Sequence, residues 1–311
     1  MIEIFVKDSQ GVRQIEHIRE NCWVNISAPS REELEKITTD FQIPMDFATD
    51  ALDPDERARI ETENGATLIM LRVPERNPKD TNIPFITLPV GIILKDDIII
   101  TVCAYNNLVK DKFIRTIKTK DFSPANRNKI IVSILQRTAL LYLNYLKEIN
   151  RKTSEIEEQL HESMRNEELI KLLSLEKSLI YFTTSLRSNE IMMEKLQRSN
   201  ILNICSENED LLEDAIIDNK QAIETANIYS NILSGMMDAF ASIISNNLNI
   251  VMKFLTSITI ILMLPTLVAS IYGMNIKLPF QDSPHAFAIT MGVSLVLTVI
   301  GVLIFLKRNW F

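Results

Sequence analysis

Hydrophobic residues gather near the C-terminal end of the chain, in two long segments without charge. No Asp, Glu, Lys or Arg occurs from Phe254 to Ile271, nor from Ala286 to Leu306. As a helix rising about 1.5 Å per residue, each segment is long enough to cross the roughly 30 Å hydrocarbon core of a bilayer. We therefore predict transmembrane helices at 253–272 and 286–306, rather than a buried helical hairpin of a soluble domain.

Runs rich in β-branched residues predict a mixed α/β domain over residues 1–122. Two turn signals, Asn64-Gly65 and Lys95-Asp96-Asp97, separate neighbouring runs and predict hairpins. Ser30 followed by Glu33 forms a capping box, which predicts a short helix directly after it. The segments expected to be strands are IEIFV, CWVNI, ATLIMLRV, ITLPVGIIL and DIIITVCAY.

Helical patterns fill the middle of the chain, where neither glycine nor proline occurs between Pro124 and Gly235. Ser123 and Pro124 together suit a helix start. We predict helices at about 124–164 and 167–200, which form an antiparallel pair within residues 123–205.

A third helix is predicted to begin at a capping box of Ser206 and Glu209 and to include the first membrane span. Only Gly235 and Pro265 interrupt its pattern. Its cytoplasmic part, 206–252, would form a stalk, and the whole helix would be roughly 95 Å long. The expected fold class is an α+β membrane protein with a cytoplasmic α/β domain and a long stalk helix that continues into the first of two C-terminal transmembrane helices.

Basic residues flank the two spans on one side. Lys253 precedes the first span and Lys307 and Arg308 follow the second, whereas the connecting segment 273–285 has a single lysine. The positive-inside rule places both termini in the cytoplasm. The connecting segment is then the outer loop, and 307–311 is a basic cytoplasmic tail of a multi-pass protein in the cell membrane.

Composition argues against several classes of function. A net charge of −7, without a basic stripe of interleaved aromatic residues, argues against nucleic acid as a partner. The histidines are isolated, and no glycine-rich phosphate loop or nucleophile motif occurs, so we expect neither an enzyme nor an organic cofactor. Cys22, Cys103 and Cys205 lack the spacing of a zinc site and are expected to be reduced thiols.

Polar and sulfur-bearing residues recur along one line of the first span, at alternating intervals of three and four, which is a heptad seam. Because two helices cannot enclose a hole, a pathway along this seam requires several subunits around an axis. Leu255 lies beside the seam and is expected to form an apolar constriction. The seam consists of Asn249, Met252, Thr256, Thr259, Met263, Thr266 and Ser270.

Ser and Thr in membrane helices also hydrogen-bond neighbouring helices or their own backbone, so the seam by itself leaves both interpretations open. The second span has fewer polar residues, Thr290, Ser294 and Thr298, and is expected to face lipid. No acidic residue lies between Asp238 and Asp282. A pathway lined by Asn, Thr and carbonyl groups suits a cation that keeps its waters, as Mg²⁺ does, and argues against a proton relay or a dedicated transition-metal carrier.

The segment Tyr272-Gly273-Met274-Asn275 ends the first span, and here the sequence resembles the CorA family of magnesium channels, whose signature is Gly-Met-Asn preceded by Tyr. The resemblance extends over MKFLTSITIILMLPTLVASIYGMN and, more weakly, over ALDPDERARIE at 51–61. It implies a funnel-shaped homopentamer in which an outer ring of Asn275 binds a hydrated cation and Gly273 gives a tight backbone at the mouth. The pore-lining residues that it implies are Asn249, Met252, Leu255, Met263 and Thr266.

Two features of the outer loop leave alternatives open. Asn275 has amide oxygens that accept hydrogen bonds from first-shell waters, but it could instead end the helix as a C-cap. Many family members carry an acidic cluster after the signature, whereas this loop has Lys277 and only Asp282. The attraction of cations at the outer mouth and the metal preference therefore stay open.

An acidic stretch begins the stalk helix. Channels of the family close when cytoplasmic Mg²⁺ binds acidic residues between neighbouring soluble domains, so the resemblance implies a regulatory metal site at Asp214, with Glu213 and Asp218 beside it. The partner acid in the α/β domain is not assigned. A solvated helix start, favoured by the helix dipole, is the alternative. The stretch consists of Glu207, Glu209, Asp210, Glu213, Asp214, Asp218 and Glu224.

The function implied is passive, channel-type transport of divalent cations into the cytoplasm, chiefly Mg²⁺ with Co²⁺ and Ni²⁺ as further candidates, and closure on cytoplasmic Mg²⁺. The expected partners are other copies of the chain, the lipid bilayer and the cations. One alternative is a zinc or other transition-metal transporter of the same architecture, against which the intact Gly-Met-Asn speaks. Another is a membrane-tethered sensor or scaffold, which would need no polar seam.

Overall fold

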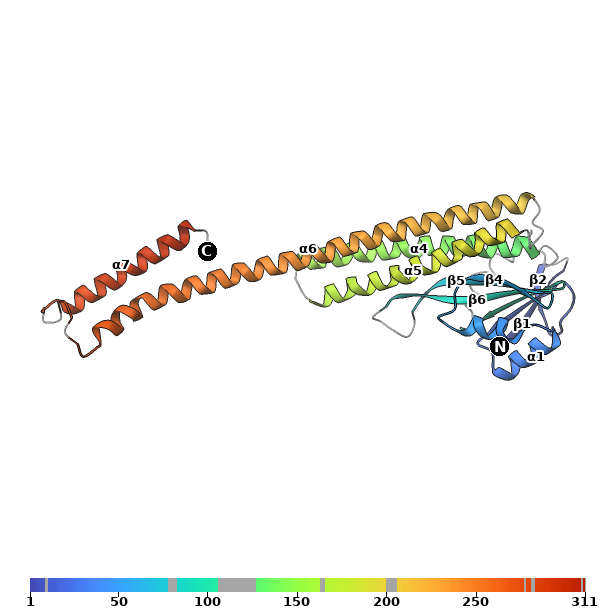
Figure 1. Ribbon diagram of the computed structural model, residues 1–311, viewed down its shortest axis with the longest axis horizontal. Helices are drawn as coiled ribbons and strands as arrows, with labels where there is room; N and C mark the ends of the chain where they lie inside the picture. The colour runs from blue at the N-terminus through green and yellow to red at the C-terminus, as the bar shows by residue number, and fades with distance from the viewer. Residues whose placement is uncertain are drawn as a thin grey trace. The chain divides into compact units, whose positions relative to one another are not determined.

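The structure, a computed structural model, describes residues 1–8, 11–77, 83–105, 127–162, 166–199, 206–276, 278–280, 283–308 and 310 (Figure 1). They form two compact units, an N-terminal unit, Met1–Gly235, and a C-terminal unit, Met236–Phe311. One helix, α6 (Ser206–Tyr272), contributes residues to both units. The predicted start of the first long helix at Pro124, the side chain of Ser206 in the predicted capping box, and Cys205 lie outside the described residues.

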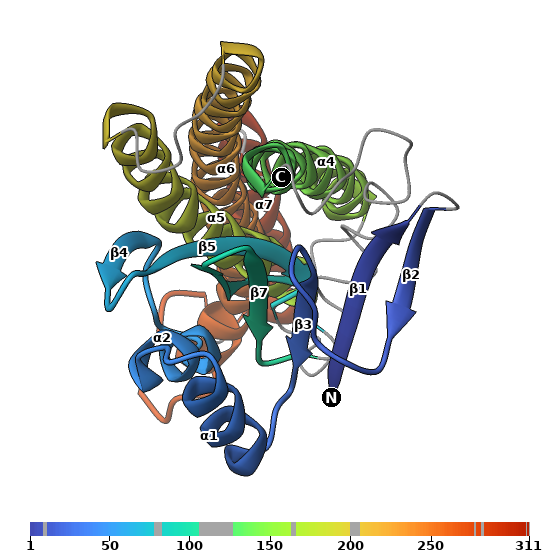
Figure 2. The ribbon, with the colours of Figure 1, turned by 90° about the vertical axis from the view of Figure 1, so that its right-hand side faces the viewer.

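A sheet of seven strands forms the centre of the N-terminal unit, in the order β2-β1-β3-β7-β6-β5-β4 (Figure 2). Neighbouring strands are antiparallel except β3 and β7, which are parallel. The strands are β1 (Ile2–Asp8), β2 (Gly11–Ile15), β3 (Trp23–Ser27), β4 (Arg59–Glu63), β5 (Ala66–Arg76), β6 (Phe85–Lys95) and β7 (Ile98–Cys103).

Both turn signals form hairpin turns, although the strand that precedes Asn64-Gly65 was not among those predicted. Asn64 and Gly65 have φ of 50° and 72° and join β4 to β5, which is the two-residue turn that favours Asn-Gly. Asp96, with φ of 47°, lies in the turn between β6 and β7. The strands β2 and β4 and the parallel pairing of β3 with β7 were not predicted. β4 has one buried residue, Ile60, so its sequence carries little hydrophobic signal.

Helices cover both faces of the sheet (Figure 2). One face packs against two short helices and a 3-10 turn, and the other against three long helices. Because successive side chains of a strand point to opposite faces, Leu68 and Met70 join the first core and Ile69 and Leu71 the second. The covering elements are α1 (Arg31–Asp40), α2 (Met45–Thr49) and η1 (Asp50–Leu52) on one face, and α4 (Arg127–Glu162), α5 (Asn166–Ser199) and the first part of α6 on the other.

The predicted capping box starts α1. The Ser30 side chain accepts a hydrogen bond from the backbone N–H of Glu33, and the Glu33 carboxylate accepts one from the Ser30 N–H. Leu34 and Ile37 then point into the core, as the helical spacing requires.

The C-terminal unit contains the last part of α6 and α7 (Ala286–Lys307), which runs back alongside it (Figure 1). Both helices are long and apolar enough to cross a membrane. Within α7 the single buried residue is Gly301, so this helix is not the core of a soluble hairpin in the described chain. An apolar helix that is exposed on nearly all sides is suited to lipid or to other membrane helices.

Candidate ion pathway

One side of α6 is fixed by its contact with α7. A Cβ atom added to Gly301 of α7 would lie 3.0 Å from Leu264 and 3.9 Å from Ile261, and Ser257 and Val268 of α6 are buried. These four α6 residues follow intervals of four, three and four, which is one face of a helix. The small residues Ser257 and Gly301 let the two backbones approach closely, as is typical of membrane helices.

The polar seam lies on the other side of α6. At about 100° per residue, its mean direction is roughly 140° around the helix from the face that contacts α7. Within the single chain, all seven seam residues and Leu255 are exposed. Met263, for example, is 63% exposed and Leu255 58%, whereas Ser257 is fully buried. α7 therefore leaves the seam open to whatever lies on that side.

The threonine hydroxyls of the seam have a fixed orientation. Those of Thr256, Thr259 and Thr266 donate to the backbone carbonyls four residues earlier, at 2.7, 2.8 and 3.1 Å. This is the bonding to their own backbone that the sequence left as an alternative. A hydroxyl that donates in this way still has lone pairs that accept. The seam therefore presents oxygen acceptors, which suit the water molecules around a hydrated cation.

The Gly-Met-Asn segment turns the chain at the end of α6. The Gly273 N–H donates to the Ala269 carbonyl at 2.9 Å, and the Met274 N–H donates to the Ile271 carbonyl at 3.2 Å. A Cβ atom at Gly273 would lie 3.3 Å from the Ala269 oxygen, a tight contact with backbone that disfavours any larger residue.

Asn275 lies three residues beyond the last helical residue, Tyr272, and its side chain is exposed. It does not have the positive φ of a left-handed C-cap. The Tyr272 hydroxyl donates to the Pro279 carbonyl at 3.4 Å, a weak contact across the loop. Lys277 and Asp282, on which the expected charge of the outer mouth depends, lie outside the described residues.

Comparison with known proteins identifies the family of this chain. A family model described as CorA-like Mg2+ transporter protein matches residues 19–308. The chain belongs to the CorA family. The Cobalt/magnesium transport protein CorA of Methanocaldococcus jannaschii is 28% identical over 294 residues, which are 93% of this chain and 90% of that protein.

Solved structures share the fold of this chain. The complete structure of the CorA magnesium transporter from Methanocaldococcus jannaschii has a TM-score of 0.85 and 25% identity, covering 100% of this chain and 99% of that one. The ZntB cytoplasmic domain from Vibrio parahaemolyticus has a TM-score of 0.60 at 15% identity, covering 79% of this chain and 96% of that one, a likeness of fold alone. The predicted family and the α+β membrane architecture are confirmed.

The acidic stretch of this CorA chain does not gather into a metal site within one copy. Glu213 and Asp214 are exposed and Asp218 is partly buried. Burial, followed by the nearby charge of Asp214, raises the pKa of Asp218. Among the described residues no three His, Cys, Asp or Glu side chains lie together as ligands for a metal. A metal at Asp214 would therefore need a ligand from elsewhere, and the side chain of Glu207 lies outside the described residues.

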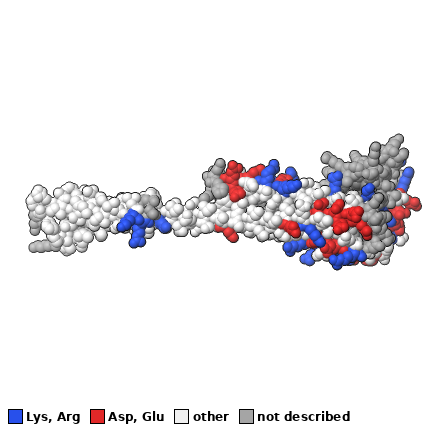
Figure 3. All heavy atoms as spheres, turned by 90° about the horizontal axis from the view of Figure 1, so that it is seen from above, with Lys and Arg blue, Asp and Glu red and all other residues white. Residues whose placement is uncertain are grey.

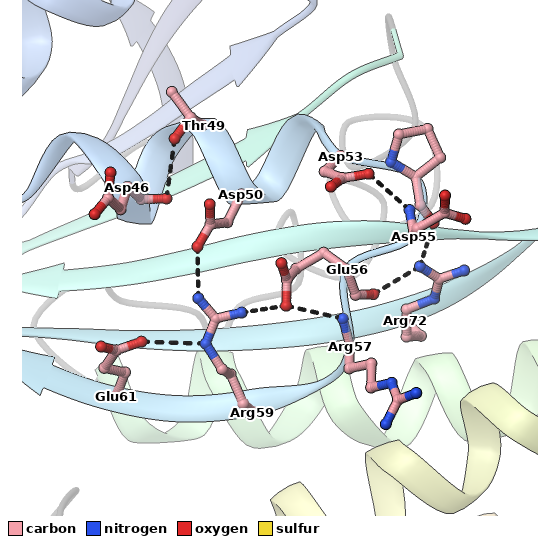
Figure 4. Close-up of polar contacts among 11 residues, drawn as sticks. Asp46, Thr49, Asp50, Asp53, Asp55, Glu56, Arg57, Arg59, Glu61 and Arg72 are labelled. Carbon is pink, nitrogen blue, oxygen red and sulfur yellow. Dashed lines mark hydrogen bonds and ion pairs between the residues drawn. The ribbon is translucent and has the colours of Figure 1, made fainter.

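The second CorA-like segment, 51–61, is held in place by two arginines (Figure 4). Arg59 pairs with Asp50 at 2.6 Å, with Glu61 at 3.1 Å and also with Glu56. The Arg72 guanidinium donates to the carbonyls of Pro54 and Glu56 and to Thr87. These contacts neutralise part of the acidic charge and fix the loop to the sheet. The segment thus has a structural role, because it connects η1 to the strands β4, β5 and β6.

Sequence patterns missed the face of α6 that contacts α7. Ser257 looks like one more polar residue of the span, and Gly301 was not singled out. A readable signal exists, because a glycine among large apolar residues in a membrane span commonly marks close helix packing.

Proposed function

We propose that this chain forms a passive channel for divalent cations, chiefly Mg²⁺, in a cell membrane. The exposed polar seam of α6 carries the proposal, because α7 covers the opposite face and leaves the seam for other copies of the chain. A homopentamer in which five seams surround an axis gives these residues a common aqueous path. CorA membership and the cobalt/magnesium transport of the Methanocaldococcus jannaschii relative support the choice of ion.

The outer ring of Asn275 selects the ion. Its amide oxygens accept hydrogen bonds from the first-shell waters of the cation, so that Mg²⁺, which loses water reluctantly, does not have to be stripped. The threonine oxygens of the seam continue this contact along the span. Leu255 and the methionines form apolar rings that interrupt the water column when they approach each other.

Closure depends on cytoplasmic Mg²⁺. Both termini lie in the cytoplasm, and Mg²⁺ binds Asp214, with Glu213 and Asp218 close by, and an acid of the neighbouring copy. Bound Mg²⁺ removes the repulsion between these carboxylates and favours the closed assembly by its differential affinity for that state. Loss of Mg²⁺ then shifts the population toward the open state. No catalytic step is involved.

Flux of Mg²⁺ into proteoliposomes that contain the purified chain and a trapped Mg²⁺ indicator tests the proposal. Asn275→Ala is expected to abolish uptake while the assembly keeps its size, because the amide that holds the hydrated ion is lost. Asn144→Ala, at an exposed position on α4, is the matched control and should transport normally. Normal flux through Asn275→Ala would overturn the pore assignment.

The same vesicles separate the alternatives. A zinc carrier of this architecture would take up Zn²⁺ in preference to Mg²⁺ when both are supplied. A Mg²⁺ channel should carry Mg²⁺, and added Co²⁺ or Ni²⁺ should reduce that Mg²⁺ uptake by competition. A membrane-tethered sensor would give no metal flux with the wild-type chain.

A further inference from the structure

The described basic side chains of the C-terminal unit gather in one cluster. On the face that Figure 3 draws, one group of Lys and Arg is visible in this unit. The described basic residues of the unit are Lys253, before the apolar part of α6, and Lys307 and Arg308, at the end of α7. Two elements that are distant in sequence therefore bring like charges to one place.

The packing of the helices explains this convergence. Gly301 lies against Leu264 and Ile261, and α7 runs antiparallel to α6 (Figure 1). Lys307 is six residues beyond Gly301, and Lys253 is eight residues before Ile261. At about 1.5 Å per residue these steps are roughly 9 and 12 Å in the same direction, so the two lysines lie at nearly the same level.

Lys253 belongs to the side of α6 that faces α7. It precedes the fully buried Ser257 by four residues, and the Ser257 hydroxyl donates to the Lys253 carbonyl at 2.7 Å. Residues four apart share a helix face. Lys253 is therefore directed toward α7 rather than along the polar seam.

The charges of this cluster have no partner among the described residues. Within the described part of the chain, none of the three side chains has an ion pair or a hydrogen bond. The preceding acid on α6, Asp238, is fifteen residues before Lys253, or roughly 22 Å along the helix. Uncompensated cations at one level attract an anion from outside the chain.

An aromatic residue lies beside the cluster. The backbone N–H of Trp310 donates to the Phe305 carbonyl at 3.2 Å, and the two rings have centroids 5.4 Å apart. Trp is enriched where a membrane meets water, at the depth of the lipid headgroups. This position favours a headgroup phosphate over a free anion.

We propose that Lys253, Lys307 and Arg308 together bind the phosphate of an anionic phospholipid of the inner leaflet. The proposal rests on the membrane placement of the proposed function. Arg and Lys form charge-assisted hydrogen bonds with phosphate, and each basic residue near an anionic membrane surface contributes about a fivefold factor in binding. A signal for topology alone requires positive charge but no preference among lipids.

Fluorescence of Trp310 reports the site. The other tryptophan, Trp23, is buried in the N-terminal unit, and Trp23→Phe removes its signal. The Trp23→Phe chain in detergent is titrated with brominated phosphatidylglycerol, which quenches a neighbouring indole. Quenching is expected at a concentration about 100-fold lower than for the triple variant Lys253→Gln, Lys307→Gln, Arg308→Gln, from three fivefold factors.

Controls decide between lipid, charge and folding. Lys36→Gln, Lys177→Gln and Arg187→Gln remove the same charge from exposed positions of the N-terminal unit and should leave quenching unchanged. Lys253→Arg with Lys307→Arg should also preserve it. Equal quenching of the wild type by brominated phosphatidylcholine, equal loss in the control triple variant, or reversal by inorganic phosphate at the lipid concentration would each overturn the proposal.

Mg²⁺ flux of the same purified chain, reconstituted into proteoliposomes, keeps the two proposals distinguishable. Normal flux without a preference for phosphatidylglycerol would overturn the lipid site and leave the channel standing. A lipid preference in a chain that carries no metal would support the lipid site and overturn the channel.

Discussion

The side-chain amide of Asn189 on α5 pairs with both backbone polar groups of Arg72 on β5. The Arg72 N–H donates to Asn189 Oδ1 at 2.9 Å, and Asn189 Nδ2 donates to the Arg72 carbonyl at 2.8 Å. The neighbouring strands do not provide both of these hydrogen bonds. Pro89, opposite Arg72 on β6, has no N–H to donate, and the pairing of β4 with β5 begins at Arg59, opposite Met70. Asn189 thus takes the place of a strand and joins the helical layer to the sheet.

Loss of this pairing should destabilise the N-terminal unit. Asn189→Ala leaves the partly buried Arg72 N–H without its partner, whereas the Arg72 carbonyl keeps the Tyr142 hydroxyl at 3.1 Å. We expect the free energy of unfolding to fall by about 2 kcal/mol. The measurement is urea unfolding followed by the fluorescence of buried Trp23, in a Trp310→Phe background. Thr184→Ala, at an exposed position of the same helix, should change the free energy of unfolding little. An equal decrease in both variants would contradict the role of Asn189 in joining α5 to the sheet.

The local elements of this fold could be predicted from sequence because their signals are local. The Asn64-Gly65 turn and the capping box of Ser30 each fix a few neighbouring residues through their own chemistry. The parallel pairing of β3 with β7 and the role of Asn189 depend on residues far apart in the chain, so no local pattern carries them. A buried Asn in the middle of a helix looks the same in sequence as a solvated one.

In the ion pathway too, only the features with a local sequence signal could be predicted. The heptad line of the seam follows from the spacing of Thr256, Thr259 and Thr266, and the structure leaves that line open. Its role in conduction stays a prediction. The metal site at Asp214 could not be completed from the sequence, since one copy brings no third ligand to it among the described residues.

Gly301 should be intolerant of added volume, because its missing Cβ is what lets α7 approach Leu264. Gly301→Leu forces a side chain into a place where even a Cβ would be 3.0 Å from Leu264, and we expect it to destabilise the helix pair by about 1–3 kcal/mol. Gly292→Leu is the matched control, since nothing lies within 4 Å of a Cβ there. Thermal unfolding in detergent, followed by circular dichroism, measures both. Similar melting of the two variants would show that α6 and α7 do not pack through Gly301.

Cysteine labelling tests which helix meets water. A cysteine at Met263 or Thr266 should react with small charged thiol reagents in the intact membrane, and one at Val296 should not, because α7 faces lipid in the proposed assembly. In the single chain Met263 and Val296 are 63% and 56% exposed, so exposure alone would not separate them. Cys22 and Cys103 are buried, and Cys205→Ser provides the background. Equal labelling of both helices would remove the seam from the pathway.

The raised pKa of Asp218 gives a pH dependence with a defined sign. Burial and the Asp214 charge make the folded chain hold this proton more tightly than the unfolded chain does. Stability should therefore fall as pH rises from the ordinary carboxyl range through the raised pKa. In chelator at pH 7, Asp218→Asn should melt at a higher temperature than the wild type, and the difference should vanish in strong acid. A lower melting temperature of Asp218→Asn at pH 7 would mean that its carboxylate is paired rather than repelled.

Mg²⁺ should reverse the loss of stability caused by the charged carboxylates of Asp214 and Asp218 if it binds between copies at the acidic stretch. Limited proteolysis of the soluble part, measured against Mg²⁺ concentration at constant ionic strength, reports closure. In the variant Glu213→Gln, Asp214→Asn, Asp218→Asn we expect protection to require at least about tenfold more Mg²⁺, since roughly 1.4 kcal/mol of the differential affinity for the closed state is lost. Asp214→Asn alone should raise the required Mg²⁺ concentration less, because the ion keeps its waters and is bound by carboxylates of two copies.

A matched variant separates a bound ion from general screening. Glu32→Gln, Asp40→Asn and Glu158→Gln remove the same charge from exposed positions, and protection should then follow the wild-type curve. Repulsion between solvated charges would be relieved by monovalent salt about as well as by Mg²⁺ at equal ionic strength, because screening depends on ionic strength and not on coordination. Protection of the wild type by monovalent salt, or the same Mg²⁺ midpoint in all three proteins, would make the acidic stretch a solvated helix start and place the sensor elsewhere.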